Sequence, residues 1–157
     1  MARGHSFHDQ QFGGSEYDPT DRGTFDQGTV FVVMAFKGQD TSDVYTAIKD
    51  ACKTLRLGAI RVDETPGSGI VIKKITQLIE QSEFIIVDLT HERPNVYYEL
   101  GYAHGVGNED LDILLIAKDG TELHFDIAPL AVKFYKSIED LQRIVLSGLE
   151  VMIKETR

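Results

Sequence analysis

The chain has 157 residues, of which 42% are hydrophobic and 26% are charged, as in an ordinary globular protein that buries its core in one domain. Its formal net charge of −9 argues against nucleic acid and membranes as partners, so we expect a small-molecule partner. A lone cysteine, Cys52, excludes a disulfide framework and a cysteine-based metal site, and we expect no metal and no cofactor. The sequence contains neither an 18-residue apolar run nor a signal peptide, which predicts a cytoplasmic protein.

The first 28 residues are polar and glycine-rich without a sustained period, which predicts a flexible tail. Residues 29–157 then form the expected single domain. It opens at residues 29–36 with a continuous β-branched and aromatic run, typical of a strand covered on both faces, which we take as the central strand. Apolar residues at three- and four-residue spacing predict a helix after residues 41–43, and Gly58 fits its end.

Strand and helix patterns alternate through the rest of the chain. We predict strands at residues 59–63, 84–89, 111–117 and 131–135 and an extended piece at 122–125. We also predict a helix that contains Ile72, Ile75 and Ile79, a helix that begins near Asn95, and a helix over residues 137–154. Ser137 provides the last helix with an N-cap. This alternation predicts an α/β protein with a flavodoxin-like three-layer sandwich, whose mostly parallel five-stranded sheet has the order 2-1-3-4-5.

Ligands of open parallel sheets bind beyond the carboxyl ends of the strands, where the strand order reverses. Here that point lies between the first and third strands. The side chains expected there are substrate-binding candidates, with Asp88 as a catalytic one: Met34, Phe36, Asp63, Asp88, Thr90 and Asn95. Three of them have structural alternatives: Asp63 as a solvated loop residue, Asp88 as the end of a strand, and Asn95 as a helix N-cap.

Glu99 stands among apolar residues of the helix that begins near Asn95. Burial of a carboxylate costs several kcal/mol unless it is paired or hydrogen-bonded, which makes Glu99 a second catalytic candidate. Gly67, Ser68 and Gly69 form a turn before a helix that could bind phosphate through backbone amides, although such turns are common without a ligand. A Walker lysine and a G-x-G-x-x-G turn are missing, so P-loop and dinucleotide-dehydrogenase functions are poor matches.

The segments 31–36, 61–63, 84–90 and 94–103 together resemble the nucleoside 2-deoxyribosyltransferase family and its TIR-like relatives. The resemblance implies cleavage or transfer at the N-glycosidic bond of a nucleoside or nucleotide. Glu99 would be the nucleophile, and Asp63 and Asp88 would orient the sugar or handle the proton of the departing base. The first strand lacks the tyrosine of these transferases, which favours bond cleavage over base exchange.

Two alternatives remain open within this interpretation. A TIR-like enzyme would use Glu99 to cleave NAD, and a catalytically idle module with the same fold would bind a nucleotide for signalling. The resemblance also implies a homodimer or higher homo-oligomer, because neighbouring subunits in the family often complete the pocket, here through residues 125–126.

Overall fold

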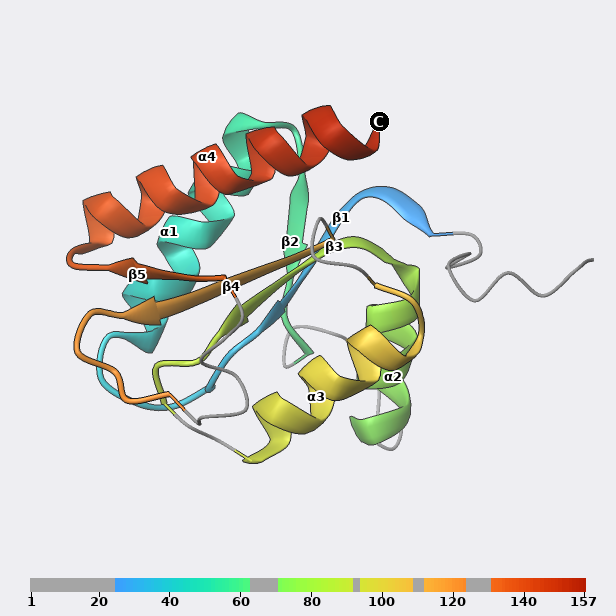
Figure 1. The fold of residues 1–157 in the computed structure, drawn as a ribbon, viewed down its shortest axis with the longest axis horizontal. Coiled ribbons are helices and arrows are strands. Elements are labelled where there is room, and N and C mark those ends of the chain that lie inside the picture. The colour runs from blue at the N-terminus through green and yellow to red at the C-terminus, as the bar shows by residue number, and fades with distance from the viewer. Residues whose placement is uncertain (1–24, 63–70, 92–93, 109–111, 124–130) are drawn as a thin grey trace, which may run out of the picture.

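The computed structural model describes residues 25–62, 71–91, 94–108, 112–123 and 131–157 (Figure 1). In this part of the chain five strands form one sheet in the order β2-β1-β3-β4-β5, and all neighbouring strands are parallel. The strands are β1 (Asp26–Val33), β2 (Gly58–Ile60), β3 (Ser82–Asp88), β4 (Ile113–Lys118) and β5 (Val132–Tyr135). The predicted flavodoxin-like fold and strand order are confirmed.

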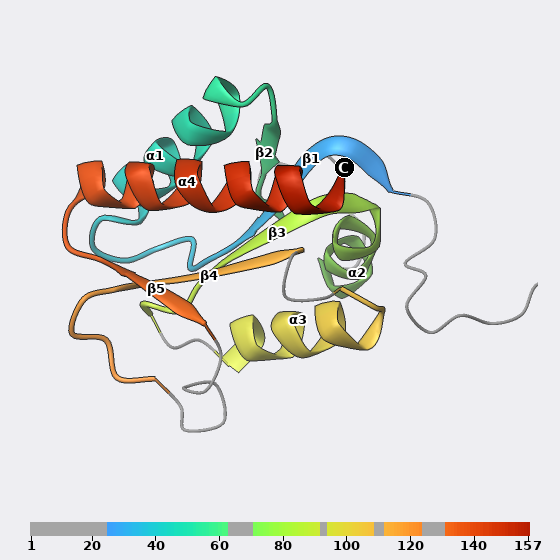
Figure 2. The same ribbon diagram turned by 45° about the horizontal axis from the view of Figure 1, so that its top comes forward.

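Within the described residues, two helices cover each face of the sheet. These are α1 (Thr41–Thr54), α2 (Val71–Gln81), α3 (Pro94–Gly105) and α4 (Ile138–Thr156). The helices α1 and α4 pack on one face and on each other, whereas α2 and α3 pack on the opposite face (Figures 1 and 2). The structure is therefore the three-layer sandwich expected from right-handed crossovers.

The central strand is β3, not β1 as the sequence pattern indicated, and all seven of its residues are buried. Its side chains alternate between the two layers, as the pleat of a strand requires. Phe84 and Ile86 join the core beneath α1 and α4, while Ile85 and Val87 join the core beneath α2 and α3. This alternation decides on which face each residue at the end of β3 lies.

The first strand begins earlier and ends earlier than predicted, at Asp26 and Val33. Asp26 pairs with Ser82, and the register then shifts before Val30 pairs with Phe84. Gly28 adopts φ 89° at this irregularity, and its amide donates to Oε2 of the buried Glu83 at 2.6 Å. The strand thus extends into the polar segment because a buried carboxylate binds its backbone.

Other local predictions are confirmed at named atoms. Ser137 is the N-cap of α4, because its hydroxyl oxygen accepts a hydrogen bond from the amide of Asp140 at 3.1 Å. Cys52 is fully buried, as expected of a small hydrophobe. The predicted extended piece at residues 122–125 lies partly outside the described residues, and its described part, residues 122–123, is not a strand.

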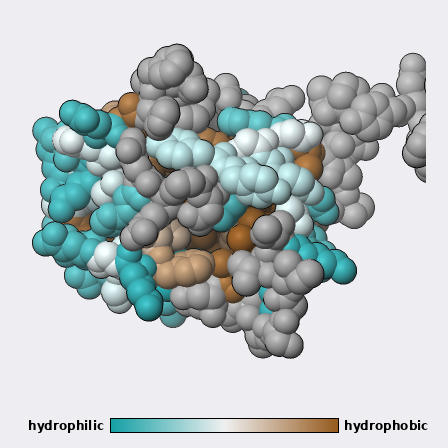
Figure 3. Space-filling view, turned by 90° about the horizontal axis from the view of Figure 1, so that it is seen from below, coloured by the Kyte–Doolittle hydropathy of each residue, from teal (hydrophilic) through white to brown (hydrophobic). Residues whose placement is uncertain are grey.

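The surface of the molecule carries both hydrophobic and hydrophilic residues. Seen from the side of α2 and α3, hydrophobic residues reach the surface near the centre of the face, among hydrophilic residues (Figure 3). Phe134 of β5 is 42% exposed. None of the described helices combines the length and the hydrophobicity needed to cross a membrane.

Candidate functional site

A pocket of about 410 Å³ lies at the carboxyl ends of the strands, on the side of α1 and α4. Its lining comes from residues 39–41 and Val44 at the start of α1, from Asp88, Thr90 and His91 at the end of β3, from Lys118 of β4, and from residues 135–138 between β5 and α4. We call it the Thr90 pocket. Its volume falls in the range of about 300–1,000 Å³ that is usual for small-molecule sites.

A larger hollow of about 560 Å³ lies elsewhere, between α4 and the first residues of β4 and β5. Its lining is mostly apolar and includes Leu114, Ile144 and Val151. It lies away from the edge at which parallel sheets bind ligands. The Thr90 pocket instead gathers carboxyl, hydroxyl and ammonium groups at that edge, so we consider it the candidate site.

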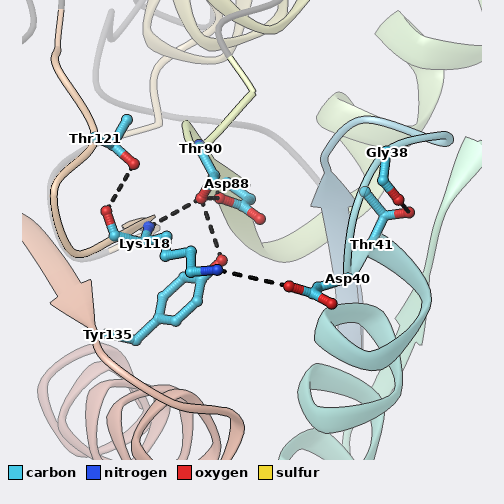
Figure 4. A network of polar contacts seen from close by, with 8 residues as sticks. All are labelled: Gly38, Asp40, Thr41, Asp88, Thr90, Lys118, Thr121 and Tyr135. Carbon is cyan, nitrogen blue, oxygen red and sulfur yellow. Dashed lines mark hydrogen bonds and ion pairs between the residues drawn. The ribbon is translucent and has the colours of Figure 1, made fainter.

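Thr90 connects the ends of three strands in this pocket (Figure 4). Its hydroxyl donates to Asp88 Oδ1 at 2.5 Å and accepts from the amide of Lys118 at 2.9 Å. The hydroxyl of Tyr135 lies 3.2 Å from the same oxygen. Since a threonine hydroxyl has one proton and two lone pairs, Tyr135 is the donor in this third contact. All hydrogen-bonding capacity of Thr90 Oγ1 is then used, which fixes its rotamer.

Asp88 forms a tight turn with Thr90. The amide of Thr90 donates to Asp88 Oδ1 at 3.0 Å, which is an Asx-turn that ends β3. Only 5% of Asp88 is exposed, and burial raises the pKa of its carboxyl group, whereas the hydrogen bonds from Thr90 oppose that shift. Asp88 is therefore an acceptor that the turn holds in place at the floor of the pocket.

Tyr135 is also buried, with 3% of its surface exposed. Burial raises the pKa of its phenol to about 12, and the charge of Asp88 adds to the shift. The phenol therefore stays protonated at neutral pH, in agreement with its role as a donor to Thr90.

An ion pair spans the pocket from the end of β4 to the start of α1. Lys118 Nζ lies 3.5 Å from Asp40 Oδ2, and about half of each side chain is exposed. Asp40 is the N-cap residue of α1 with φ 63°, but its side chain makes no capping hydrogen bond. The carboxylate of Asp40 thus pairs with a lysine rather than with the amides of its own helix.

The loops that follow β1 and β3 touch each other where the strand order reverses. A Cβ atom on Gly38 would lie 3.3 Å from Cε1 and Nε2 of His91, and the φ of this residue is 152°. Only glycine allows such an approach without a shift of the neighbour. The Thr90 pocket accordingly extends from this contact toward β4 and β5, rather than opening between β1 and β3.

Of the predicted site residues, the structure brings Asp88 and Thr90 together in this pocket. Met34 instead lies in the core beneath α1 and α4, with 4% exposed. Phe36 is 47% exposed, and its ring lies 5.5 Å from the Arg61 guanidinium. Neither Met34 nor Phe36 lines the pocket.

The remaining predicted site residues cannot be placed in this pocket. Asp63, Gly67, Ser68 and Gly69 fall outside the described residues. Asn95 is the second residue of α3 rather than its N-cap, and its side chain is not described.

Glu99 is buried as expected, with 5% exposed, but it does not line the Thr90 pocket. The pleat of β3 puts Asp88 on the face of Phe84 and Ile86, which α1 and α4 cover. Glu99 belongs to α3, which covers the opposite face (Figure 1). The structure therefore does not bring the two expected catalytic carboxylates into one pocket.

The pocket residues that sequence reasoning missed include four with ionisable side chains: Asp40, Lys118, Tyr135 and Lys136. Three of them end a strand or follow it directly, and the rule that parallel sheets bind ligands at these ends could have identified them. Asp40 had no such signal, because its position depends on the left-handed turn before α1.

The sequence matches no family model, and no curated protein is similar enough to count as a relative. Among solved structures, the chain is similar to a flavo di-iron protein from Thermotoga maritima. Two mutants of that protein match with TM-scores of 0.62 and 0.61, each at 16% identity over 88% of this chain. A diflavin flavoprotein A3 from Nostoc sp. matches with a TM-score of 0.49 and 12% identity over 85% of this chain and 94% of its own.

The chain spans only 38% of the length of the flavo di-iron proteins that it matches. At 16% identity the likeness establishes the fold and nothing finer. The assignment to the nucleoside 2-deoxyribosyltransferase family was wrong, since the matching structures are flavo di-iron proteins and no family model supports it. The predicted cleavage or transfer at an N-glycosidic bond rested on this assignment and is wrong as well. NAD cleavage and nucleotide sensing rested on the same assignment and are not supported either.

Proposed function

We propose that this domain binds a small phosphate-bearing ligand in the Thr90 pocket, and that the ligand is flavin mononucleotide. The observation that carries the proposal is the position of this pocket, at the carboxyl edge of a sheet in the order 2-1-3-4-5. Flavodoxin binds flavin mononucleotide at this edge, at its β1/β3 switch point, and the Thr90 pocket begins at the contact between the loops that follow these two strands and extends from there toward β5. The names of the matching flavo di-iron proteins point to the same class of cofactor.

The groups that line the pocket fit the separate parts of this ligand. Lys118 and Lys136 provide positive charge for a phosphate group. Asp88 provides an acceptor and Ser137 a hydroxyl group for a polyol chain, while Val44 and Ile138 provide apolar surface for a ring. The donor set therefore suits a ligand that is anionic at one end and apolar at the other.

A bound flavin would supply one- and two-electron redox chemistry. The contribution of this chain is to bind and orient. Thr90 is locked by its three contacts, so that the pocket floor is organised before the ligand enters. The same contacts hold two further side chains in place. The hydroxyl of Tyr135 donates to Thr90, and the carboxyl group of Asp88 accepts from Thr90.

Titration of the purified protein with flavin mononucleotide, followed by flavin fluorescence and calorimetry, tests the proposal. We expect saturable binding at one site, with riboflavin binding more weakly because it lacks the phosphate. Lys136→Gln should weaken flavin mononucleotide more than riboflavin, whereas Lys154→Gln, a lysine near the end of α4 that is not among the pocket residues, should change neither. The absence of saturable binding would refute flavin as the ligand.

We also propose that the protein forms a homo-oligomer and that it is cytoplasmic. Light scattering at micromolar protein concentration, with and without flavin mononucleotide, measures the mass of the particle. A monomeric mass under both conditions would contradict the homo-oligomer.

A further inference from the structure

We propose that Asp40 holds Lys118 in the position where the ligand's phosphate would bind, so that ligand binding exchanges one ion pair for another. Asp40 then acts as a specificity residue, because an anion binds tightly only if it attracts Lys118 more strongly than the carboxylate of Asp40 does. The inference rests on the proposed function, since it concerns the same pocket, but it makes a separate prediction.

The first support is the geometry of the ion pair (Figure 4). Both partners line the Thr90 pocket, and Lys118 Nζ lies 3.5 Å from Asp40 Oδ2 across it. The exposed fractions of the two side chains are 52% and 47%. An ion pair this exposed contributes little to stability, so a ligand can break it at low cost.

The second support is that hydrogen bonds hold the backbone of Lys118 independently of its side chain. The amide of Lys118 donates to Thr90 Oγ1 at 2.9 Å, and its carbonyl oxygen accepts from the hydroxyl of Thr121 at 2.6 Å. The amide of Thr121 also donates to this carbonyl, at 3.1 Å. The ammonium group can therefore turn from Asp40 toward a ligand without any movement of β4.

The third support is the unusual use of Asp40. An aspartate at the N-cap commonly accepts a hydrogen bond from an amide of the first helical turn. Asp40 makes no such bond, and its left-handed backbone belongs to the turn that leads its carboxylate toward Lys118. The charge of Asp40 also repels an anion in the pocket, as does any negative charge on Asp88.

The test compares flavin mononucleotide, riboflavin and inorganic pyrophosphate as ligands of Asp40→Asn. Asparagine has the same shape and tolerates a left-handed conformation, so the turn before α1 is retained. We expect the dissociation constants of flavin mononucleotide and pyrophosphate to fall about two- to fivefold, which is the range of an exposed ion pair. The dissociation constant of riboflavin should not change.

Two further variants separate this exchange from a general effect of charge. Asp50→Asn removes the same charge from a position of α1 outside the pocket, and should leave all three affinities unchanged. In a Lys118→Gln background, Asp40→Asn should lose most of its effect, because the two residues act as a pair.

The outcomes distinguish this inference from the proposed function. If wild-type protein binds flavin mononucleotide but Asp40→Asn binds it no more tightly, the exchange is refuted and the proposed function stands. If flavin does not bind but pyrophosphate binds more tightly to Asp40→Asn than to wild type, the proposed ligand fails and the exchange stands. If neither anion binds to either protein, both are refuted.

Discussion

Glu83 and Arg157 form a two-point ion pair at the edge of the sheet opposite the candidate site. Arg157 Nε donates to Glu83 Oε1 and Arg157 Nη2 donates to Glu83 Oε2, both at 2.8 Å. Oε2 also accepts from the amide of Gly28 at 2.6 Å. Glu83 is only 3% exposed, so its charge depends on these partners. A single carboxylate thus joins β3 to the start of β1 and to the residue that follows α4.

Replacement of this carboxylate should destabilise the fold. Glu83→Ala leaves the amide of Gly28 and the guanidinium of Arg157 without these hydrogen bonds, and bonds to a charged group contribute about 1.5–3 kcal/mol each. We expect the free energy of unfolding in urea to fall by at least about 2 kcal/mol, the scale of a single lost charged bond. Arg143→Ala breaks an exposed pair with Asp140 and should cost much less than Glu83→Ala. Equal losses in the two variants would contradict this interpretation.

Thr90→Val should destabilise the protein and damage the pocket together. Valine has the same shape, but it leaves the hydroxyl of the buried Tyr135 and the more exposed amide of Lys118 without their acceptor, and it removes the hydroxyl donor of Asp88. An unsatisfied buried group costs about 1–3 kcal/mol, which is the loss that we expect in urea unfolding. Thr90→Ser keeps the hydroxyl and should recover most of this loss. A Thr90→Val protein as stable as wild type would show that the three contacts do not stabilise the strand ends.

The alkaline limit of stability should depend on Tyr135. Burial raises the pKa of Tyr135 from 10.0 to about 12, so the unfolded chain loses this phenolic proton first as the pH rises. The contribution is complete below the unfolded pKa of 10.0 and is lost as the pH rises to about 12. The buried thiol of Cys52, whose pKa rises from 9.0 to about 12, adds a loss of the same sign.

Urea unfolding of wild type and of Tyr135→Phe at several pH values between about 9 and 12 measures this contribution. The variant should lose less stability than wild type over the interval, although it begins lower because its contact with Thr90 is gone. Tyr98→Phe alters a residue of α3 that is 57% exposed and should keep the wild-type slope. Identical slopes in all three proteins would contradict a buried, protonated phenol.

The fold could be predicted from the sequence because its signals are local. Continuous apolar runs mark strands buried on both faces, and their alternation with helices requires parallel connections. The polar end of β3 was also predictable, since Asp88 ends a run of apolar residues and Thr90 follows two positions later. Their partners were not, because Tyr135 reaches Thr90 only through the register that places Lys118 opposite Tyr135 on neighbouring strands.

Two buried carboxylates show that the energetic cost of burying a charge does not by itself reveal what the residue does. Glu99 was recognised because its neighbours are apolar, but burial by itself did not reveal a function or place it beside Asp88. Glu83 was overlooked, although it is buried as deeply. Its partners, Gly28 and Arg157, are 55 and 74 residues away in the chain, so only the folded structure reveals why the charge is tolerated.

Two glycines within helices provide a matched test of packing. A Cβ atom on Gly101 of α3 would meet none of the described residues within 4 Å, whereas one on Gly148 of α4 would lie 3.0 Å from Leu114 Cδ1. Alanine is favoured over glycine inside a helix by about 1 kcal/mol, so Gly101→Ala should raise the free energy of unfolding by about 0.5–1 kcal/mol.

Gly148→Ala gains the same helical preference but forces the buried Leu114 side chain to move, and overpacking costs about 1–3 kcal/mol. We therefore expect Gly148→Ala to be neutral or destabilised by up to about 2 kcal/mol in urea unfolding, since the packing cost exceeds the helical gain. Equal stabilisation of both variants would mean that α4 does not pack as closely on β4 as these distances indicate.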